Sequence, residues 1–234
     1  MDKDEILRHE NGLVVDFDEL DNLKLAPTTH IMTHPLIEHK IDIMRSTSVK
    51  SLDFRRLVEE ITTMLCYEAT RDLPMEEYEV QTPICTTIGK KIAGKKLVWA
   101  PIMRAGLGME YAAKEIVPSS RTGHIGLFRD EVTLEPQKYF WKMPKEVVKR
   151  QIFVLDPMLA TGGSADAAIA KLKEVGCDTI RFICIIAAPR GVNLLQRKHP
   201  DVELYIGHLD KGLNSMGYIV PGLGDAGDRI FGTK

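Results

Sequence analysis

The sequence predicts an α/β fold in which a central parallel β-sheet is flanked by helices. Short apolar runs alternate with helical patterns along the second half of the chain, and loops rich in small residues follow two of these runs. Strands of a parallel sheet are buried on both faces and therefore appear as continuous apolar runs. Ligands of such sheets bind at the carboxyl ends of the strands, where these loops would lie.

The length of 234 residues is enough for a sizeable core and favours one domain with an appendage. Residues 1–29 are acidic and weakly patterned, so we expect an N-terminal extension held loosely against a domain that spans residues 30–234. The 31 basic residues nearly cancel the 33 acidic residues, and this balance provides no positive field for a polyanion. Nucleic acid is therefore not an expected partner.

The apolar segments and the cysteines indicate a cytoplasmic protein. No apolar stretch approaches the roughly 20 residues of a membrane-spanning helix, and the start of the chain lacks the apolar core of a signal peptide. We therefore expect no membrane partner. The cysteines lie in apolar segments without CxxC spacing, which favours reduced core residues; they are Cys66, Cys85, Cys177 and Cys184.

Three histidines lie close together near the start of the domain, at His30, His34 and His39. Pro35 follows His34 and prevents a regular helical pair of ligands, and no carboxylate stands where a metalloprotease would have one. Surface or capping histidines are the favoured interpretation, with a metal site as the lesser alternative.

An amphipathic helix is predicted from Ser51 onwards. Ser51 is expected to cap this helix, and Pro74 lies beyond its end. The stretch between this helix and residue 95 is interpreted as turn-rich. The apolar stripe follows the spacing of one helical face; it consists of Leu57, Val58, Ile61, Met64 and Leu65.

Three units of strand, loop and helix are predicted next. They cover residues 95–118, 151–176 and 179–199, and residues 202–209 supply a further strand. Gly176 is the expected stop signal of the second helix. These units repeat the pattern of a parallel sheet with crossover helices.

The loop of the second unit has the properties of a phosphate site. Residues 160–164 read ATGGS, and such small residues let several backbone N–H groups point into one concavity. The helix that follows adds the positive end of its dipole. Asp156 precedes this seat and would face the hydroxyls of a ribose, so a ribose 5-phosphate unit fits both features. A tight turn that binds nothing is the alternative interpretation.

The sequence does not fit two other nucleotide-binding motifs. A GxxxxGK[ST] loop needs a lysine after its last glycine, whereas Ser164 follows Gly163. The segment GLGDAG at residues 222–227 matches GxGxxG. Only residues 228–234 follow it, too few for the helix and the acidic residue of a dinucleotide site.

Four motifs together resemble the uracil phosphoribosyltransferases. In this sequence they are MRAGLGM, RDEVTLEPQKYF, VLDPMLATGGS and GYIVPGLGDAGDRIFGTK, and the similarity runs from about Ile31 to Lys234. The resemblance implies a type I phosphoribosyltransferase fold with a β-arm lid and a small C-terminal hood that binds the base. It also implies transfer of ribose 5-phosphate from phosphoribosyl pyrophosphate (PRPP) to N1 of uracil, giving UMP and pyrophosphate in pyrimidine salvage.

The resemblance assigns roles to particular residues. The implied PRPP-binding set is Arg104, Arg129, Asp156, Pro157, Met158, Leu159, Ala160, Thr161, Gly162, Gly163, Ser164 and Asp225. The implied uracil-binding set is Ile219, Gly224, Asp225 and Ala226, and the catalytic set is Asp225, Arg129 and Arg104. A fixed guanidinium near the leaving pyrophosphate would stabilise the charge that grows as its bond to the sugar breaks.

The resemblance further implies a lid, a metal ion and regulation. Residues 128–141 are predicted to form a two-stranded arm, which covers the site in this family and excludes water. An ordinary surface hairpin is the alternative. Mg²⁺ is expected as cofactor, held mainly through PRPP without an assigned protein ligand. GTP as an activator and a homodimer or higher homo-oligomer are expected from parts of the family.

Two other functions are alternatives to this enzyme. One is a nucleotide-binding regulator of RNA attenuation that has the same fold, and the near-neutral charge argues against it. The other is a transferase for a purine base, which the segment GYIVPGLGDAG disfavours.

Overall fold

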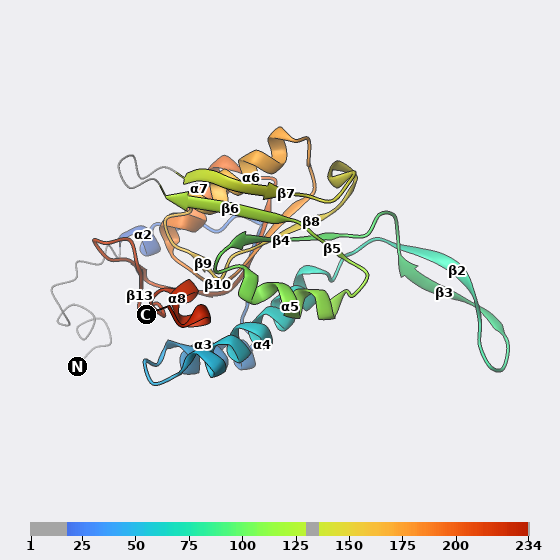
Figure 1. Cartoon of the computed structure of the whole chain (residues 1–234), viewed down its shortest axis with the longest axis horizontal. Helices are drawn as coiled ribbons and strands as arrows, with labels where there is room; N and C mark the ends of the chain where they lie inside the picture. The colour runs from blue at the N-terminus through green and yellow to red at the C-terminus, as the bar shows by residue number, and fades with distance from the viewer. Residues whose placement is uncertain (1–17, 130–135, 234) are drawn as a thin grey trace.

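A computed structural model describes residues 18–129 and 136–233 of the chain (Figure 1). Its helices are α2 (Asp18–Asp21), α3 (Pro35–Arg45), α4 (Ser51–Ala69), α5 (Leu107–Ile116), the 3₁₀ helix η1 (Val147–Lys149), α6 (Gly163–Glu174), α7 (Pro189–Lys198) and α8 (Ala226–Phe231). Its strands are β1 (Thr29–Ile31), β2 (Met75–Gln81), β3 (Thr86–Ile92), β4 (Val98–Met103), β5 (Arg121–Thr122), β6 (His124–Arg129), β7 (Pro136–Lys142), β8 (Ile152–Leu155), β9 (Met158–Leu159), β10 (Ile180–Ala187), β11 (Glu203–Leu209), β12 (Gly212–Leu213) and β13 (Ile219–Val220).

The central sheet has the strand order β1-β11-β10-β8-β4-β6-β7, with β5 beside β4 and β9 beside β10. Within the described residues its pairings are parallel except for the antiparallel pair β6–β7. This arrangement confirms the α/β fold predicted from the sequence. Pro101 of β4 pairs with Leu155 of β8, so the segments after these two strands leave the sheet at the same edge.

Helices cover both faces of this sheet. The helices α3, α4 and α5 lie on one face, and α6 and α7 lie on the other (Figure 1). All eight residues of β10 are buried, which explains why this strand appears in the sequence as one apolar run. The predicted strand–loop–helix units are therefore confirmed.

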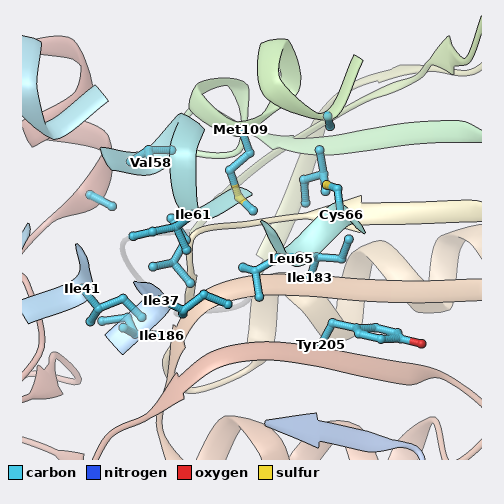
Figure 2. Close-up of a cluster of buried hydrophobic side chains, with 14 of the residues drawn as sticks. Ile37, Ile41, Val58, Ile61, Leu65, Cys66, Met109, Ile183, Ile186 and Tyr205 are labelled. Atoms are coloured by element: carbon cyan, nitrogen blue, oxygen red, sulfur yellow. The ribbon is translucent and has the colours of Figure 1, made fainter. Parts of the chain in front are cut away.

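Figure 2 shows the core between the sheet and the first layer of helices. Ile183 and Ile186 of β10 face Ile61 and Leu65 of α4, and all four residues are fully buried. Met109 joins the same cluster from α5. This packing fixes the sheet under the helices, and it leaves the loops at the carboxyl ends of the strands to form a site.

The helix termini agree with the sequence in most places. The helix α4 begins at Ser51, but Lys50 occupies the cap position and makes no side-chain cap hydrogen bond, so the cap predicted at Ser51 is wrong. Gly176 adopts a positive φ of 98° just after α6, as expected of a stop signal. His34 accepts a hydrogen bond from the N–H of Leu36 at 3.2 Å and so caps α3, which confirms its capping role.

The stretch between α4 and β4, interpreted as turn-rich, contains the hairpin β2–β3, which extends away from the body of the molecule (Figure 1). The hairpin was missed because its strands do not alternate between buried and exposed residues. Cross-strand pairs stabilise the hairpin where burial does not, as in the ion pair between Lys91 Nζ and Glu76 Oε1, which lie 3.1 Å apart. Cys85 lies in its turn and is exposed, so its assignment to the core is wrong, whereas the other three cysteines are buried.

The segment before β1 contacts the body of the protein. The N–H of Ala26 donates to Oε1 of Gln196 in α7 at 2.6 Å, and the N–H of Leu204 in β11 donates to the carbonyl of Thr28 at 2.8 Å. Thr29 already belongs to the sheet, one residue before the predicted domain boundary. No described helix has the length and apolar character needed to cross a membrane.

The arm predicted over residues 128–141 is present as the antiparallel pair β6–β7, which forms one edge of the central sheet (Figure 1). Arg129 at the end of β6 pairs with Pro136 at the start of β7. The turn of this arm is expected at Leu134, Glu135 and Pro136; the first two lie outside the described residues, and Pro136 is already the first residue of β7. The small C-terminal hood consists of the two-stranded sheet β12–β13 and the helix α8.

Candidate functional site

A cavity of about 400 Å³ lies at the carboxyl edge of the sheet, between the loop after β8 and the C-terminal segment. Its volume is within the range of small-molecule sites. The lining residues come from two stretches that are far apart in the sequence; they are Asp156, Met158, Leu159, Ala160, Thr161, Gly162, Gly163, Ser164 and Ala165, and Met216, Gly217, Tyr218, Ile219 and Asp225. The predicted phosphate loop and the predicted base-binding segment thus meet at one cavity.

The loop 160–164 leads directly into α6, which begins at Gly163. The first N–H groups of a helix have no partner within that helix, and the helix dipole is positive at this end. Gly162 adopts a φ of 87°, and a Cβ at this position would lie 2.8 Å from Cδ2 of Leu194. Glycine is therefore required at Gly162, where the chain turns from the loop into the helix. This geometry suits a phosphate group.

Asp156 stands at the end of β8 and lines the same cavity. Its carboxyl group is largely removed from bulk water, and this burial raises its pKa to about 7. The N–H of Met158, 3.5 Å from Oδ1, opposes the rise because it stabilises the charged form. A carboxyl group with this pKa changes charge near neutral pH, and such groups are common at functional sites.

The remaining loop residues have different positions. Met158 and Leu159 form β9 and line the cavity. Pro157 is buried and does not line the cavity. Its carbonyl accepts hydrogen bonds from the N–H groups of Ile185 and Ile186, both at 3.1 Å. Pro157 thus fastens the loop to β10.

Asp225 caps the last helix and also faces the cavity. Its Oδ1 accepts a hydrogen bond from the N–H of Asp228 at 2.8 Å, which places it at the N-cap of α8. Gly224 adopts a φ of 78° and lines a neighbouring cavity of about 650 Å³, which Tyr218 and Asp225 share with the first. Residues of the segment from Tyr218 to Asp225 therefore contribute to both cavities.

The comparisons with known proteins agree with this geometry. The family model described as uracil phosphoribosyltransferase matches residues 31–233. A protein named uracil phosphoribosyltransferase from Finegoldia magna is 56% identical over 204 residues, which cover 87% of this chain and 98% of that protein. A protein of the same name from Streptococcus agalactiae serotype III is 54% identical over the same shares. The solved structure of AQ2163 from Aquifex aeolicus is 37% identical, has a TM-score of 0.82 and covers 87% of this chain and 97% of that one.

The chain belongs to the uracil phosphoribosyltransferase family. The family assignment rests on matches that cover most of the chain, and the structure adds the arrangement of the motifs. Two of the uracil phosphoribosyltransferase motifs, VLDPMLATGGS and GYIVPGLGDAGDRIFGTK, supply most of the walls of the first cavity.

The arginine of the MRAG motif of this family lies beside the last helix. Arg104 does not line the first cavity; its guanidinium is 55% exposed and its Nη2 lies 3.3 Å from Oδ1 of Asp228 in α8. The guanidinium also lies 5.7 Å from the centre of the Phe231 ring. Arg104 follows β4 and so belongs to the same edge of the sheet as Asp156. The second arginine, Arg129, ends β6, and its role stays a prediction.

Sequence reasoning missed some residues of the site. Met216, Gly217 and Tyr218 line the first cavity, and a Cβ at Gly217 would lie 3.8 Å from Cγ2 of Thr161. The signal was available, because Gly217 and Tyr218 open the quoted motif GYIVPGLGDAG of the uracil phosphoribosyltransferases. Ala226 is fully buried at the first position of α8 and lines neither cavity, so its assignment to the uracil site stays a prediction.

The raised pKa of Asp156 predicts a pH-dependent stability. Because the folded pKa of about 7 exceeds the ordinary value of 3.8, the folded chain holds this proton more tightly than the unfolded chain. The resulting stabilisation is complete below about pH 4 and is lost as the pH rises through about 7. The free energy of unfolding of the native chain should therefore fall relative to that of Asp156→Asn across this window. Urea unfolding of both proteins between pH 4 and pH 8 measures the difference, and parallel pH curves would contradict the prediction.

Proposed function

We propose that this chain transfers ribose 5-phosphate from PRPP to N1 of uracil, giving UMP and pyrophosphate. One observation carries the proposal: the phosphate loop and the C-terminal segment line the same cavity, although about 50 residues separate them. A reaction that joins a phosphorylated sugar to a base requires a binding element for each reactant at bonding distance. The names of the relatives support uracil as the base.

In the proposed complex the loop holds the donor. The N–H groups of residues 160–164 and the dipole of α6 bind the 5-phosphate, and Asp156 accepts hydrogen bonds from the ribose hydroxyls. Asp156 accepts them most strongly when it is charged, which its pKa of about 7 permits at and above neutral pH. These contacts fix the sugar so that its C1 faces the segment that contains Ile219 and Asp225.

In the proposed reaction N1 of uracil bonds to C1 as the bond from C1 to the pyrophosphate oxygen breaks, and the N1 proton is released. The leaving pyrophosphate gains negative charge, so positive groups near it stabilise the transition state more than the ground state. We assign this role to Arg104 and Arg129. The exposed guanidinium of Arg104 would leave Asp228 to meet the pyrophosphate.

Mg²⁺ fits the donor set of this site. Asp156 and Asp225 supply carboxylate oxygens to the first cavity, and such hard oxygen ligands suit Mg²⁺. The described residues contain no group of three His, Cys, Asp or Glu side chains arranged to hold a metal ion. We therefore propose that PRPP itself supplies most of the ligands. When bound, the ion neutralises charge on the pyrophosphate.

Base recognition is assigned to the backbone of Ile219, Gly224, Asp225 and Ala226. Main-chain groups reach a small ring only where side chains are absent, which accounts for Gly224. Uracil has a hydrogen-bond donor at N3, where cytosine has an acceptor. A carbonyl directed at N3 would leave cytosine with an unpaired buried contact.

The RNA regulator is not favoured, and neither is a purine transferase. Relatives that match 87% of the chain are named uracil phosphoribosyltransferase. The sequence has no basic excess that would favour RNA binding instead. The first test of the function is to mix the protein with Mg²⁺, PRPP and each of uracil, cytosine, hypoxanthine, guanine and orotate. We expect UMP from uracil and turnover of cytosine that is lower by about 100-fold or more. Equal turnover of uracil and cytosine would contradict the proposed base recognition, and turnover of a purine alone would contradict the function.

The role of Asp225 predicts a loss of activity without a loss of fold. Asp225→Asn removes the charge, but an asparagine also caps helices and still accepts the N–H of Asp228. Turnover should fall by roughly 100-fold while the melting temperature stays close to that of the native protein. Asp201→Asn is the matched control, since Asp201 is an exposed partner of Lys173 far from the site. Activity of Asp225→Asn near the native level would refute the assigned role.

We also propose a homo-oligomer that associates through the β2–β3 hairpin. The hairpin extends from the body (Figure 1). It exposes large apolar side chains, which monomeric proteins rarely concentrate in one place. They are Met75, Tyr78, Ile84, Ile88 and Ile92. Ile88→Lys should lower the molar mass measured by light scattering towards that of one chain, 26.3 kDa, whereas the exposed control Leu25→Lys should not. A native mass of one chain would contradict the proposal. GTP, an activator in parts of the family, should be included in a parallel sample.

A further inference from the structure

A buried ion pair connects α3 to the C-terminal segment. Arg45, the last residue of α3, donates from Nη2 to Oδ1 of Asp210 at 2.6 Å and from Nη1 to Oδ2 at 2.9 Å. The side chain of Asp210 is 0% exposed and that of Arg45 is 16% exposed. A carboxylate with so little access to water is stable only when its oxygens are well paired.

The same pair holds both polar backbone groups of Gly222. The N–H of Gly222 donates to Oδ2 of Asp210 at 3.0 Å, and Nη1 of Arg45 donates to the carbonyl of Gly222 at 2.8 Å. Gly222 has a φ of 63°, and a Cβ there would lie 2.0 Å from the carbonyl oxygen of Ile219. The ion pair therefore sets the tight turn that begins at Ile219.

The neighbouring residue is tied to the end of α3 as well. Arg229 of α8 donates from Nη1 to the carbonyl of Leu223 at 2.8 Å and from Nη2 to the carbonyl of Ser46 at 2.7 Å. Its guanidinium lies 4.2 Å from the centre of the Phe54 ring of α4. Residues 222 and 223 are thus both held in place immediately before Gly224 and Asp225.

Asp210 also connects this turn to the sheet. It follows the last residue of β11, and its N–H donates to the carbonyl of Ala187 at the end of β10 at 2.8 Å. Nε2 of His208 lies 3.5 Å from Oδ1 of Asp210. The carboxylate therefore joins a rigid edge of the sheet to the backbone of the segment that lines both cavities.

We infer that Arg45 and Asp210 are positioning residues for the base. They act on the main chain of residues 219–224 and thereby set the direction of the backbone groups that meet uracil. The inference rests on the proposed base site. It differs from a purely structural role, because a pair that only stabilised the fold would affect the binding of both substrates alike. The hydrogen bonds of the pair to the segment end on backbone atoms of Gly222, which is what a device for orienting backbone groups requires.

The test compares steady-state constants of two variants with those of the native protein. Asp210→Asn keeps the shape but cannot accept from Gly222 and from both Arg45 nitrogens as the carboxylate does. Arg45→Lys keeps the charge but loses the planar fork. For both, KM for uracil should rise by about tenfold, while KM for PRPP rises by no more than about twofold, because residues 160–164, which make most of the proposed PRPP contacts, are unaffected and only Asp225 of that set lies next to the disturbed turn. Glu60→Gln, which breaks the pair of α3 with α4 at Lys40, is the matched control and should leave both constants unchanged.

The outcomes separate the two proposals. If the native protein forms no UMP, the proposed function fails, and this inference fails with it. If the native protein is active and both KM values in a folded variant are unchanged, or rise together, the positioning role is wrong and the function stands. Melting curves show whether each variant is folded. Should Asp210→Asn not fold, Arg45→Lys decides the matter, because lysine retains a positive charge beside Asp210.

Discussion

In the proposed function, the binding of an anion by main-chain N–H groups at the start of α6 is the constraint around which the rest of the site is arranged. These groups converge because β8 ends at Asp156, the loop is fastened to β10 through Pro157, and Gly162 provides the turn into the helix. A phosphate bound there fixes the distance from the sugar to every other part of the site.

The second half of the site depends on a different kind of support. The C-terminal segment packs Ile219, Leu223 and Ile230 into the main core, and hydrogen bonds from α3 and β11 additionally hold its backbone. The two halves meet where Gly217 approaches Thr161. The edge of the sheet thus carries the loop after β8 directly and the C-terminal segment through a buried ion pair.

Much of this arrangement could be predicted from the sequence. The strands β4, β8 and β10 are recognisable because nearly all their residues are buried, and the loop after β8 is recognisable by its run of small residues. The hairpin β2–β3 could not be recognised, since its stability comes from cross-strand pairs and its side chains are mostly exposed. The contact between Arg45 and Asp210 spans 165 positions of the chain, and such a pairing requires the folded topology.

The most direct measurement of the central claim is the amide NMR spectrum of the protein during titration with ribose 5-phosphate. The account predicts that the largest shifts occur at the N–H groups of residues 160–164, and that Gly162→Val, which forces a side chain onto a left-handed turn, abolishes them. If the largest shifts lie elsewhere in the chain while the amides of Thr161 and Gly163 stay in place, the account is contradicted.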